Sequence, residues 1–301
     1  MAASSVFTHT NHPAFYYEDM LADKVRMQLY RRAINEVVKP GAIVADLGTG
    51  MGVLAMMAIQ AGAAHVFAVD NRPQIFPVTQ AVVDQNGMTD RITLINGDAR
   101  TVRLEQKVDV IINELIGDFG TDENIYECVS AFARANLKAD GCIMPKGIRT
   151  LLVPLEHNDE FRGVWRSDYQ GLDLSCVASI PCREEAVMRF LSAQPKELAT
   201  PAMLEDITFN INMAPRQTRF EGNFQLHSDG VLHGFMGFFE TALTDHIRLS
   251  NYPQYPGCHW QTWHWPVYPF RRFQVGQHLT AVLNAIPNMV AQGWTLEWST
   301  A

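Results

Sequence analysis

The chain has 301 residues, 47% of them hydrophobic and 19% charged, which suits one large globular domain or two ordinary ones. Its formal net charge of −8 argues against a nucleic-acid-binding protein, which needs a basic face, and leaves an acidic surface that attracts cationic substrates. No apolar run is long enough to span a bilayer, and residues 1–13 lack the layout of a secretory signal, so we expect a cytoplasmic protein without a membrane partner.

Cysteines and histidines predict neither a disulfide framework nor a metal site. The five cysteines are an odd number at scattered spacings, which indicates free thiols in a reducing compartment. The ten histidines are dispersed, and no spacing among them predicts a set of metal ligands.

The first half of the chain is expected to alternate between helices and strands. A helix is predicted over 19–38, where apolar residues recur at helical intervals, and Pro40-Gly41 ends it. Such alternation is typical of a parallel sheet flanked by helices. Strands are predicted at 42–48, 65–71, 92–98 and 108–114, and helices at 53–63, 73–87 (broken near Pro77) and 125–137 (ended by an Asp140-Gly141 turn).

The pattern changes at Pro145-Lys146-Gly147, which we take as a domain boundary. Beyond it the segments are rich in aromatic and β-branched residues and often alternate, which predicts an antiparallel β-barrel or sandwich. Ser228-Asp229-Gly230 is predicted to be a hairpin turn, and Arg162–Pro201 an irregular excursion used for association. The predicted strands are 147–156, 207–214, 222–227, 234–243, 246–251, 278–286 and 293–298.

A glycine-rich loop lies between the first predicted strand and the next helix. Its glycines, Gly48, Gly50 and Gly52, allow the backbone to turn sharply and to approach a ligand closely. A dinucleotide fold prefers a third glycine at the position of Val53. The observed spacing, with Asp46 two residues before the first glycine, is the S-adenosylmethionine pattern of class I methyltransferases. A tight strand–helix turn without a ligand is the alternative.

Further acids follow the next two strands. Asp70, followed by Asn71, can accept hydrogen bonds from both ribose hydroxyls of the cofactor. Asp98-Ala99 follows the third strand, where a methyltransferase holds the adenine. In series with the glycine loop, these residues predict a bound adenosine.

Two glutamates bracket the loop after the fourth strand. Glu114 ends the strand and Glu123 follows it across a loop with Gly117 and Gly120. Ligands of parallel sheets bind at the carboxyl ends of the strands, so these carboxylates could hold a guanidinium or orient a nucleophile. Solvated loop acids, or a helix N-cap at Glu123, are the alternative.

Several segments together resemble the protein arginine methyltransferases over nearly the whole chain. They are MLADKVRMQLYRRAI before the glycine loop, NELIGDFGTDE as the double-glutamate loop, YQGLDLSCV as part of the dimerisation arm, and LSNYPQYPGCHWQ as the Thr-His-Trp loop with Cys258 in place of threonine. The resemblance implies α/β architecture: a class I methyltransferase Rossmann-like domain followed by an antiparallel β-barrel domain. The implied parts are an N-terminal helical segment over the cofactor (1–40), a cofactor-binding domain (41–145) and a barrel domain (146–301) with an arm at about 162–201, and a homodimer forms through that arm.

The resemblance also assigns residues by position. Arg26 would bind the methionine carboxylate of S-adenosylmethionine, and Met20 would line the space near the reacting methyl. On the acceptor side, Glu114 and Glu123 would grip the guanidinium, and Glu114 would also border the cofactor. Asp23 and His259 would form an Asp–His pair beside them, and Trp260 would pack under that loop. The residues expected to bind the acceptor are Tyr16, Tyr17, Glu114, Glu123, His259 and Trp260. For Asp23 and His259, a structural hydrogen bond without chemistry is the alternative, and for Arg26 a surface helix charge.

The sequence departs from the family pattern around the acceptor. The Tyr-Phe-x-x-Tyr motif is replaced by FTHTN at 7–11, the family's histidine is Tyr17, and Trp-Met-Gly-Tyr is replaced by Leu-Ile-Gly-Asp at 115–118. A rebuilt acceptor site around retained glutamates indicates a change of substrate.

An aromatic run at 259–270 has two interpretations. Its residues Trp263, His264, Trp265, Tyr268 and Phe270 either pack a β-strand or form a wall for a flat acceptor such as an indole. The acceptor we expect first is therefore a small guanidino (arginine-like) or indole-like molecule of specialised metabolism, and the second is arginine in a protein. The third hypothesis is a catalytically inactive protein that binds the cofactor and acts as a scaffold.

Overall fold

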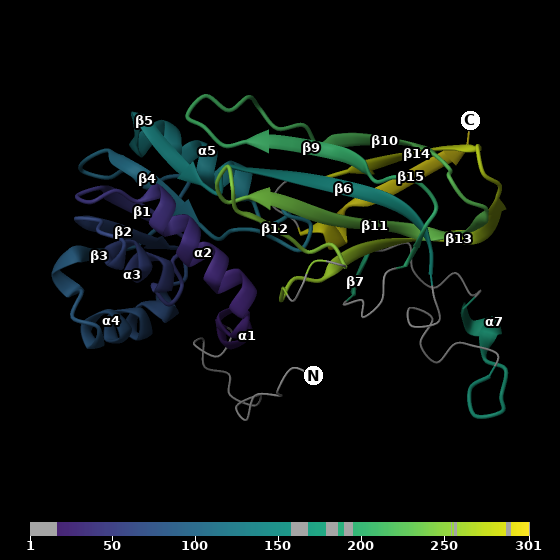
Figure 1. The fold of residues 1–301 in the computed structure, drawn as a ribbon, viewed down its shortest axis with the longest axis horizontal. Helices are drawn as coiled ribbons and strands as arrows, with labels where there is room; N and C mark the ends of the chain where they lie inside the picture. The colour runs from purple at the N-terminus through teal and green to yellow at the C-terminus, as the bar shows by residue number, and fades with distance from the viewer. Residues whose placement is uncertain are drawn as a thin grey trace.

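The computed structural model describes residues 17–157, 168–178, 186–189, 195–253, 255, 258–286 and 290–300. An α/β half and a β-rich half lie end to end along the long axis (Figure 1). The helices of the first half are α1 (Glu18–Ala22), α2 (Lys24–Val37), α3 (Val53–Gln60), α4 (Phe76–Gln85) and α5 (Ile125–Asn136).

Five parallel strands form the central sheet of the first half in the order β3-β2-β1-β4-β5. The central strand β1 is nearly all buried, as expected for a strand covered by helices on both faces. Because the strands are parallel, the residues that follow β1, β2, β3 and β4 share one edge of the sheet. The strands are β1 (Ile43–Leu47), β2 (His65–Asp70), β3 (Ile92–Asn96), β4 (Val108–Asn113) and β5 (Leu137–Met144).

Two expectations for this half are wrong. Pro77 does not break a helix; it lies in the first turn of α4, where a proline costs no hydrogen bond, and a 3₁₀ turn, η2 (Pro73–Ile75), precedes it. Asp140-Gly141 is not a turn after α5. It lies inside β5, which pairs with β4 across a register shift, and a Cβ at Gly141 would meet Asp109 O at 2.9 Å.

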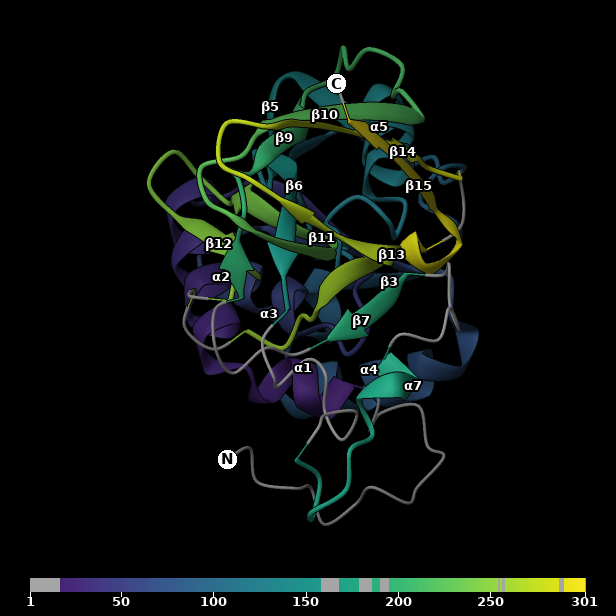
Figure 2. The ribbon, with the colours of Figure 1, turned by 90° about the vertical axis from the view of Figure 1, so that its right-hand side faces the viewer.

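The β-rich half is a barrel of antiparallel strands that curl around a common interior (Figure 2). One sheet has the order β7-β13-β11-β6-β8, with β9 on β6 and β12 on β11, and the other has the order β10-β14-β15. The strands are β6 (Gly147–Glu156), β7 (Val187–Arg189), β8 (Lys196–Glu197), β9 (Ala202–Thr208), β10 (Arg219–Gln225), β11 (Gly230–Ala242), β12 (Arg248–Ser250), β13 (Thr262–Phe273), β14 (His278–Asn284) and β15 (Thr295–Thr300).

The predicted hairpin at Ser228-Asp229-Gly230 is wrong, because the strands on either side of it belong to different sheets. β10 pairs with β14, whereas β11 pairs with β6 and β13. The connection is held instead by Lys196 Nζ, which donates to Asp229 O at 2.8 Å, and by Val275 N, which donates to Asp229 Oδ1 at 2.7 Å.

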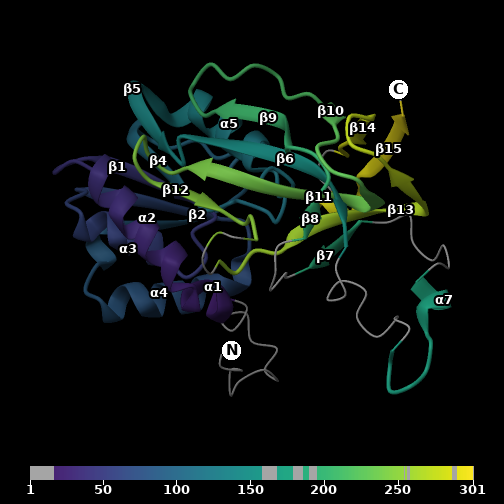
Figure 3. The ribbon, with the colours of Figure 1, turned by 45° about the vertical axis from the view of Figure 1, so that its right-hand side comes forward.

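The two halves share a hydrophobic core. A single cluster joins Ile34 of α2 and Ile112 of β4 to Ile148, Phe239 and Trp260 of the β-rich half. Apart from this body, α7 (Ser175–Ala178) stands away from the rest of the molecule (Figure 3). No helix in the described ranges is both long and apolar enough to cross a membrane.

Candidate active site

The glycine loop after β1 has the geometry of a ligand cradle. Gly48, Gly50 and Gly52 have φ values of 70°, 51° and 76°, a left-handed conformation that strains other residues. There is also no room for a side chain, because a Cβ at Gly48 would lie 2.5 Å from Leu115 Cδ2 and one at Gly50 would lie 2.5 Å from the ring of Tyr17.

Asp46 presents an unsatisfied carboxylate oxygen at this loop. Its Oδ2 accepts from Thr49 Oγ1 at 2.6 Å and from Ala55 N at 3.1 Å, while its buried Oδ1 has no partner in the described part of the chain. Burial raises the pKa of Asp46 to about 7. An ammonium group would supply both the missing donor and the missing charge, so the site fits the methionine end of S-adenosylmethionine.

The acids after β2 and β3 have protein partners in this structure. Asp70 is buried, and its carboxylate accepts from Gly50 N and Arg72 N, each at 2.9 Å, which ties the two loops together. Asn71 is exposed beside it. Asp98 accepts from Arg100 Nη2 at 2.6 Å, which lowers the pKa of Asp98. Ala99, half-buried, packs against the core.

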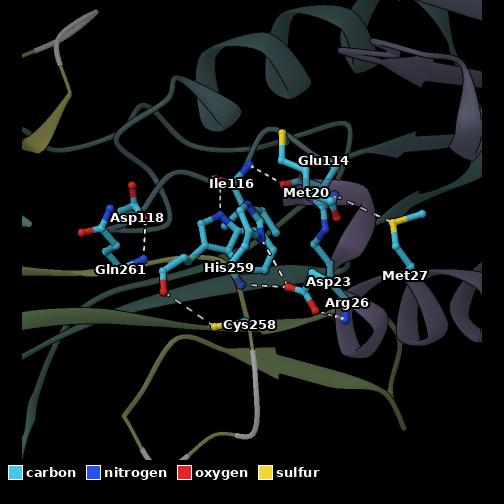
Figure 4. Close-up of polar contacts among 11 residues, drawn as sticks. Met20, Asp23, Arg26, Met27, Glu114, Ile116, Asp118, Cys258, His259 and Gln261 are labelled. Carbon is cyan, nitrogen blue, oxygen red and sulfur yellow. Dashed lines mark hydrogen bonds and ion pairs between the residues drawn. The ribbon is translucent and has the colours of Figure 1, made fainter. Parts of the chain in front are cut away.

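Arg26 and Glu114 form a buried ion pair at the end of β4 (Figure 4). Their side chains are 5% and 10% exposed, and burial raises the pKa of Glu114 although the charge of Arg26 opposes this. Arg26 Nη2 donates to Met20 O at 2.6 Å, and its guanidinium lies 5.6 Å from the Trp260 ring. Arg26 Nε is buried with no partner among the described residues, which leaves a donor for a cofactor carboxylate.

The segment after β12 reaches α2 through Asp23 and His259 (Figure 4). Asp23 Oδ1 accepts from Arg26 N at 2.9 Å and so caps α2, while Oδ2 accepts from His259 N at 2.9 Å and lies 3.3 Å from His259 Nδ1. Burial opposes ionisation of Asp23, but these hydrogen bonds prevail and lower its pKa. Trp260 Nε1 donates to Ile116 O at 2.8 Å, and Cys258 is a half-buried free thiol.

Glu123 lies against Gly117 on the same loop as Glu114, since a Cβ at Gly117 would lie 2.9 Å from Glu123 Cγ. Its side chain is reached by water. The surrounding protein and then the charges of Asp122, Glu114 and Asp118 raise the pKa of Glu123 to about 8. The two glutamates are therefore within electrostatic reach of each other.

Sequence reasoning did not single out two further carboxylates of this loop as site residues. Asp118 accepts from Gln261 N at 2.6 Å, and burial raises its pKa to about 6. Asp122 is buried and accepts from Phe119 N at 2.9 Å and from Trp263 Nε1 at 3.1 Å. Asp118 stands where the family has a tyrosine, and this substitution was the signal available in the sequence.

Tyr17 lies on the cofactor side of the site. Its buried ring packs on Gly50, and the Arg72 guanidinium lies 5.2 Å from the ring centroid. The predicted role of Tyr17 in acceptor binding stays a prediction, and Tyr16 lies outside the described residues.

The aromatic run divides between the barrel interior and the surface. Trp263, His264 and Trp265 are buried, and Trp265 packs edge-on against Phe119 with ring centroids 5.4 Å apart. Tyr268 and Phe270 are 45% and 39% exposed on β13. The burial of the two tryptophans supports the packing interpretation over a wall for an indole.

Comparisons with known proteins also point to a methyltransferase. Residues 27–148 match the family model described as ribosomal protein L11 methyltransferase (PrmA). Protein arginine N-methyltransferase 1 of Dictyostelium discoideum is 29% identical over 282 residues, which cover 90% of this chain and 81% of that protein.

Two solved structures share the fold. The Trypanosoma brucei protein arginine methyltransferase 1 enzyme–prozyme heterotetrameric complex with S-adenosylhomocysteine has a TM-score of 0.76 at 23% identity, covering 95% of this chain and 92% of that one. Arabidopsis thaliana protein arginine methyltransferase 10 has a TM-score of 0.74 at 22% identity, covering 94% and 97%. The chain is thus similar to the protein arginine methyltransferases in sequence and in fold, and these matches support an S-adenosylmethionine-dependent class I methyltransferase.

Proposed function

We propose that the enzyme methylates a guanidinium nitrogen of arginine in a protein or peptide. The observation that carries this proposal is the pair of carboxylates, Glu114 and Glu123, on one loop beside the glycine cradle, with Glu114 fixed by Arg26. Carboxylates bind guanidinium groups through paired, charge-assisted hydrogen bonds. The relatives named above are protein arginine methyltransferases, which supports a protein acceptor.

On the cofactor side, the protein's own groups would bind the two ends of the ligand. Asp46 Oδ1 would accept from the methionine ammonium and Arg26 Nε would donate to the methionine carboxylate, because both atoms are buried without a described partner. Asp70 and Asn71 would meet the ribose, and Asp98 with Ala99 the adenine. S-adenosylmethionine, when bound, supplies a methyl group on a sulfonium that needs no further activation.

On the acceptor side, the carboxylates would orient the guanidinium and receive its proton. Glu114 and Glu123 concentrate positive charge on the nitrogens they bind, which leaves the remaining nitrogen more nucleophilic. A new N–C bond forms as the S–C bond breaks, and the nitrogen then releases a proton. Glu123, with a pKa of about 8, is a suitable acceptor for that proton, and the Asp23–His259 pair lies beside the site to carry it further.

A small cationic guanidino acceptor is a second candidate. Asp118 adds a carboxylate whose charge reaches Glu123, at a position where the family has a tyrosine. This additional negative charge would favour an acceptor with a second positive group, such as the α-ammonium of free arginine.

An acceptor screen tests both candidates. Methyl transfer would be measured with an arginine-rich peptide, free arginine and a tryptophan derivative, with Glu114→Gln as the inactive reference and the exposed Glu105→Gln as the matched control. We expect peptide methylation that Glu114→Gln abolishes and Glu105→Gln retains. Methylation of the tryptophan derivative alone, or full activity of Glu114→Gln, would contradict the proposal.

We propose domain boundaries near residue 40 and at residues 145–147. We also propose that the protein forms a homodimer through the arm of residues 162–201. The supporting observations are that α7 stands away from the body and that Leu172 is 61% exposed (Figure 3). Light scattering should report a mass of twice 33.8 kDa, and a Leu172→Asp variant should shift it toward the monomer.

A further inference from the structure

A buried ionic cluster on the barrel side holds the loop that carries Glu123. Arg216 lies between β9 and β10 and binds both oxygens of the Glu205 carboxylate. Arg216 Nε donates to Glu205 Oε1 at 2.7 Å, and Arg216 Nη2 donates to Glu205 Oε2 at 3.0 Å. Arg216 Nη2 also donates to Thr121 Oγ1 at 2.7 Å, and this hydroxyl donates to Glu205 Oε2 at 2.7 Å. The hydroxyl of Thr121 is thus fixed by a donor and an acceptor from the barrel.

The cluster has little freedom to rearrange. The side chains of Arg216 and Glu205 are 11% and 4% exposed, and Thr121 is 1% exposed. The Arg216 guanidinium lies 5.8 Å from the Phe220 ring centroid and 5.5 Å from that of Trp294. The Glu205 carboxylate therefore binds the nitrogens of this guanidinium, and the two aromatic rings pack near its planar faces. Its position is determined by packing as well as by charge.

Glu123 depends on its backbone for its position. No hydrogen bond or ion pair of its side chain is found within the described ranges, and water reaches it. Thr121 stands two residues before it, Asp122 is bound to the barrel through Trp263 Nε1, and Asn124, at φ 64°, is the N-cap residue of α5. The Glu123 backbone is therefore bracketed by an anchor on the barrel and by a helix.

We infer that Arg216 is a positioning residue for the reaction, acting through the Thr121 hydroxyl to place the Glu123 carboxylate. This inference rests on the proposed guanidinium acceptor. Arg216 touches neither the glycine cradle nor Arg26, so its effect should fall on the acceptor and not on the cofactor.

A double-mutant cycle tests the inference. Thr121→Val keeps the shape and removes the hydroxyl, and we expect it to lower kcat/KM for the acceptor by roughly ten- to hundredfold, as a small misplacement of a reacting group does. Thr121→Ser should recover activity to within about threefold of the wild type. Arg216→Met combined with Thr121→Val should be no worse than Arg216→Met alone, because the two residues act as one unit. Cofactor affinity measured by calorimetry should stay unchanged throughout.

Arg219→Met is the matched control, since this arginine lies nearby on β10 with a side chain 64% exposed, and it should keep wild-type kinetics. Additive losses in the cycle, full activity of Thr121→Val, or an equal loss of cofactor affinity would overturn the inference. If Arg216→Met does not fold, the comparison of Thr121→Val with Thr121→Ser still decides. A wild-type enzyme that methylates no guanidinium at all would instead remove the proposed function.

Discussion

The titration of Glu123 leads to a quantitative prediction for the pH dependence of the reaction. Although water reaches the Glu123 side chain, the surrounding protein and three neighbouring carboxylates raise its pKa to about 8, and only the ionised carboxylate can bind a guanidinium as an ion pair. With that pKa, roughly one tenth of the enzyme is competent at about pH 7 and roughly nine tenths at about pH 9. Because kcat/KM reports the free enzyme, it should rise roughly tenfold over this range.

The assay is initial-rate methylation of the arginine-containing acceptor at saturating cofactor, from about pH 6 to about pH 9.5 at constant ionic strength. The acceptor itself does not titrate here because the pKa of its guanidinium lies above about 12. The kcat profile should rise at lower pH than the kcat/KM profile, since a bound guanidinium stabilises the ionised form of Glu123.

Glu123→Gln is the decisive perturbation. Its residual kcat/KM should lack the alkaline rise, whereas Glu105→Gln, on an exposed loop, should keep it. A wild-type kcat/KM that is flat from about pH 7 to about pH 9, or a Glu123→Gln profile that still rises, would refute the assignment of this titration to Glu123.

Three further predictions concern other residues of the candidate site. Asp118→Asn should shift the alkaline rise of kcat/KM to lower pH by up to about one unit, because it removes a like charge beside Glu123. Arg26→Met should destabilise the protein to urea by about 3–5 kcal/mol by leaving Glu114 buried without its partner, and adding Glu114→Gln should restore most of that stability but no activity. Cofactor affinity measured by calorimetry should strengthen as pH rises through about 7, where Asp46 ionises, and Asp46→Asn should lose this dependence.

The fold could be predicted largely from local patterns. Each strand of the parallel sheet except β5 is visible as an apolar run between turn residues, and the glycine loop follows the first of them. β5 was missed because Asp140-Gly141 has the composition of a turn, and only pairing with β4 across a register shift makes it part of a strand. The hairpin at 228–230 failed for the same reason: its residues predict a turn, but tertiary pairing sends the flanking strands to different sheets.

The candidate site was predictable as a list of residues but not as a set of contacts. The spacing of the strand-end acids and the resemblance to a known family located Asp46, Glu114 and Glu123. The contacts that fix the Glu114–Glu123 loop come from distant parts of the chain, such as Arg26 for Glu114 and Arg216 for Thr121, and no local pattern pairs these residues. The same limit left the aromatic run ambiguous until the structure placed Trp263 and Trp265 inside the barrel.

Arg26 would couple the binding of the cofactor to the binding of the guanidinium acceptor at the proposed site. Its Nη1 binds Glu114, its Nη2 binds Met20 O, and its buried Nε is the donor left for the cofactor carboxylate. The Arg26 guanidinium is planar and rigid. A cofactor carboxylate bound at Nε would therefore also fix the Nη1 group that binds Glu114. Cofactor binding would therefore fix the acceptor carboxylate, and by linkage a bound acceptor would tighten the cofactor by the same factor.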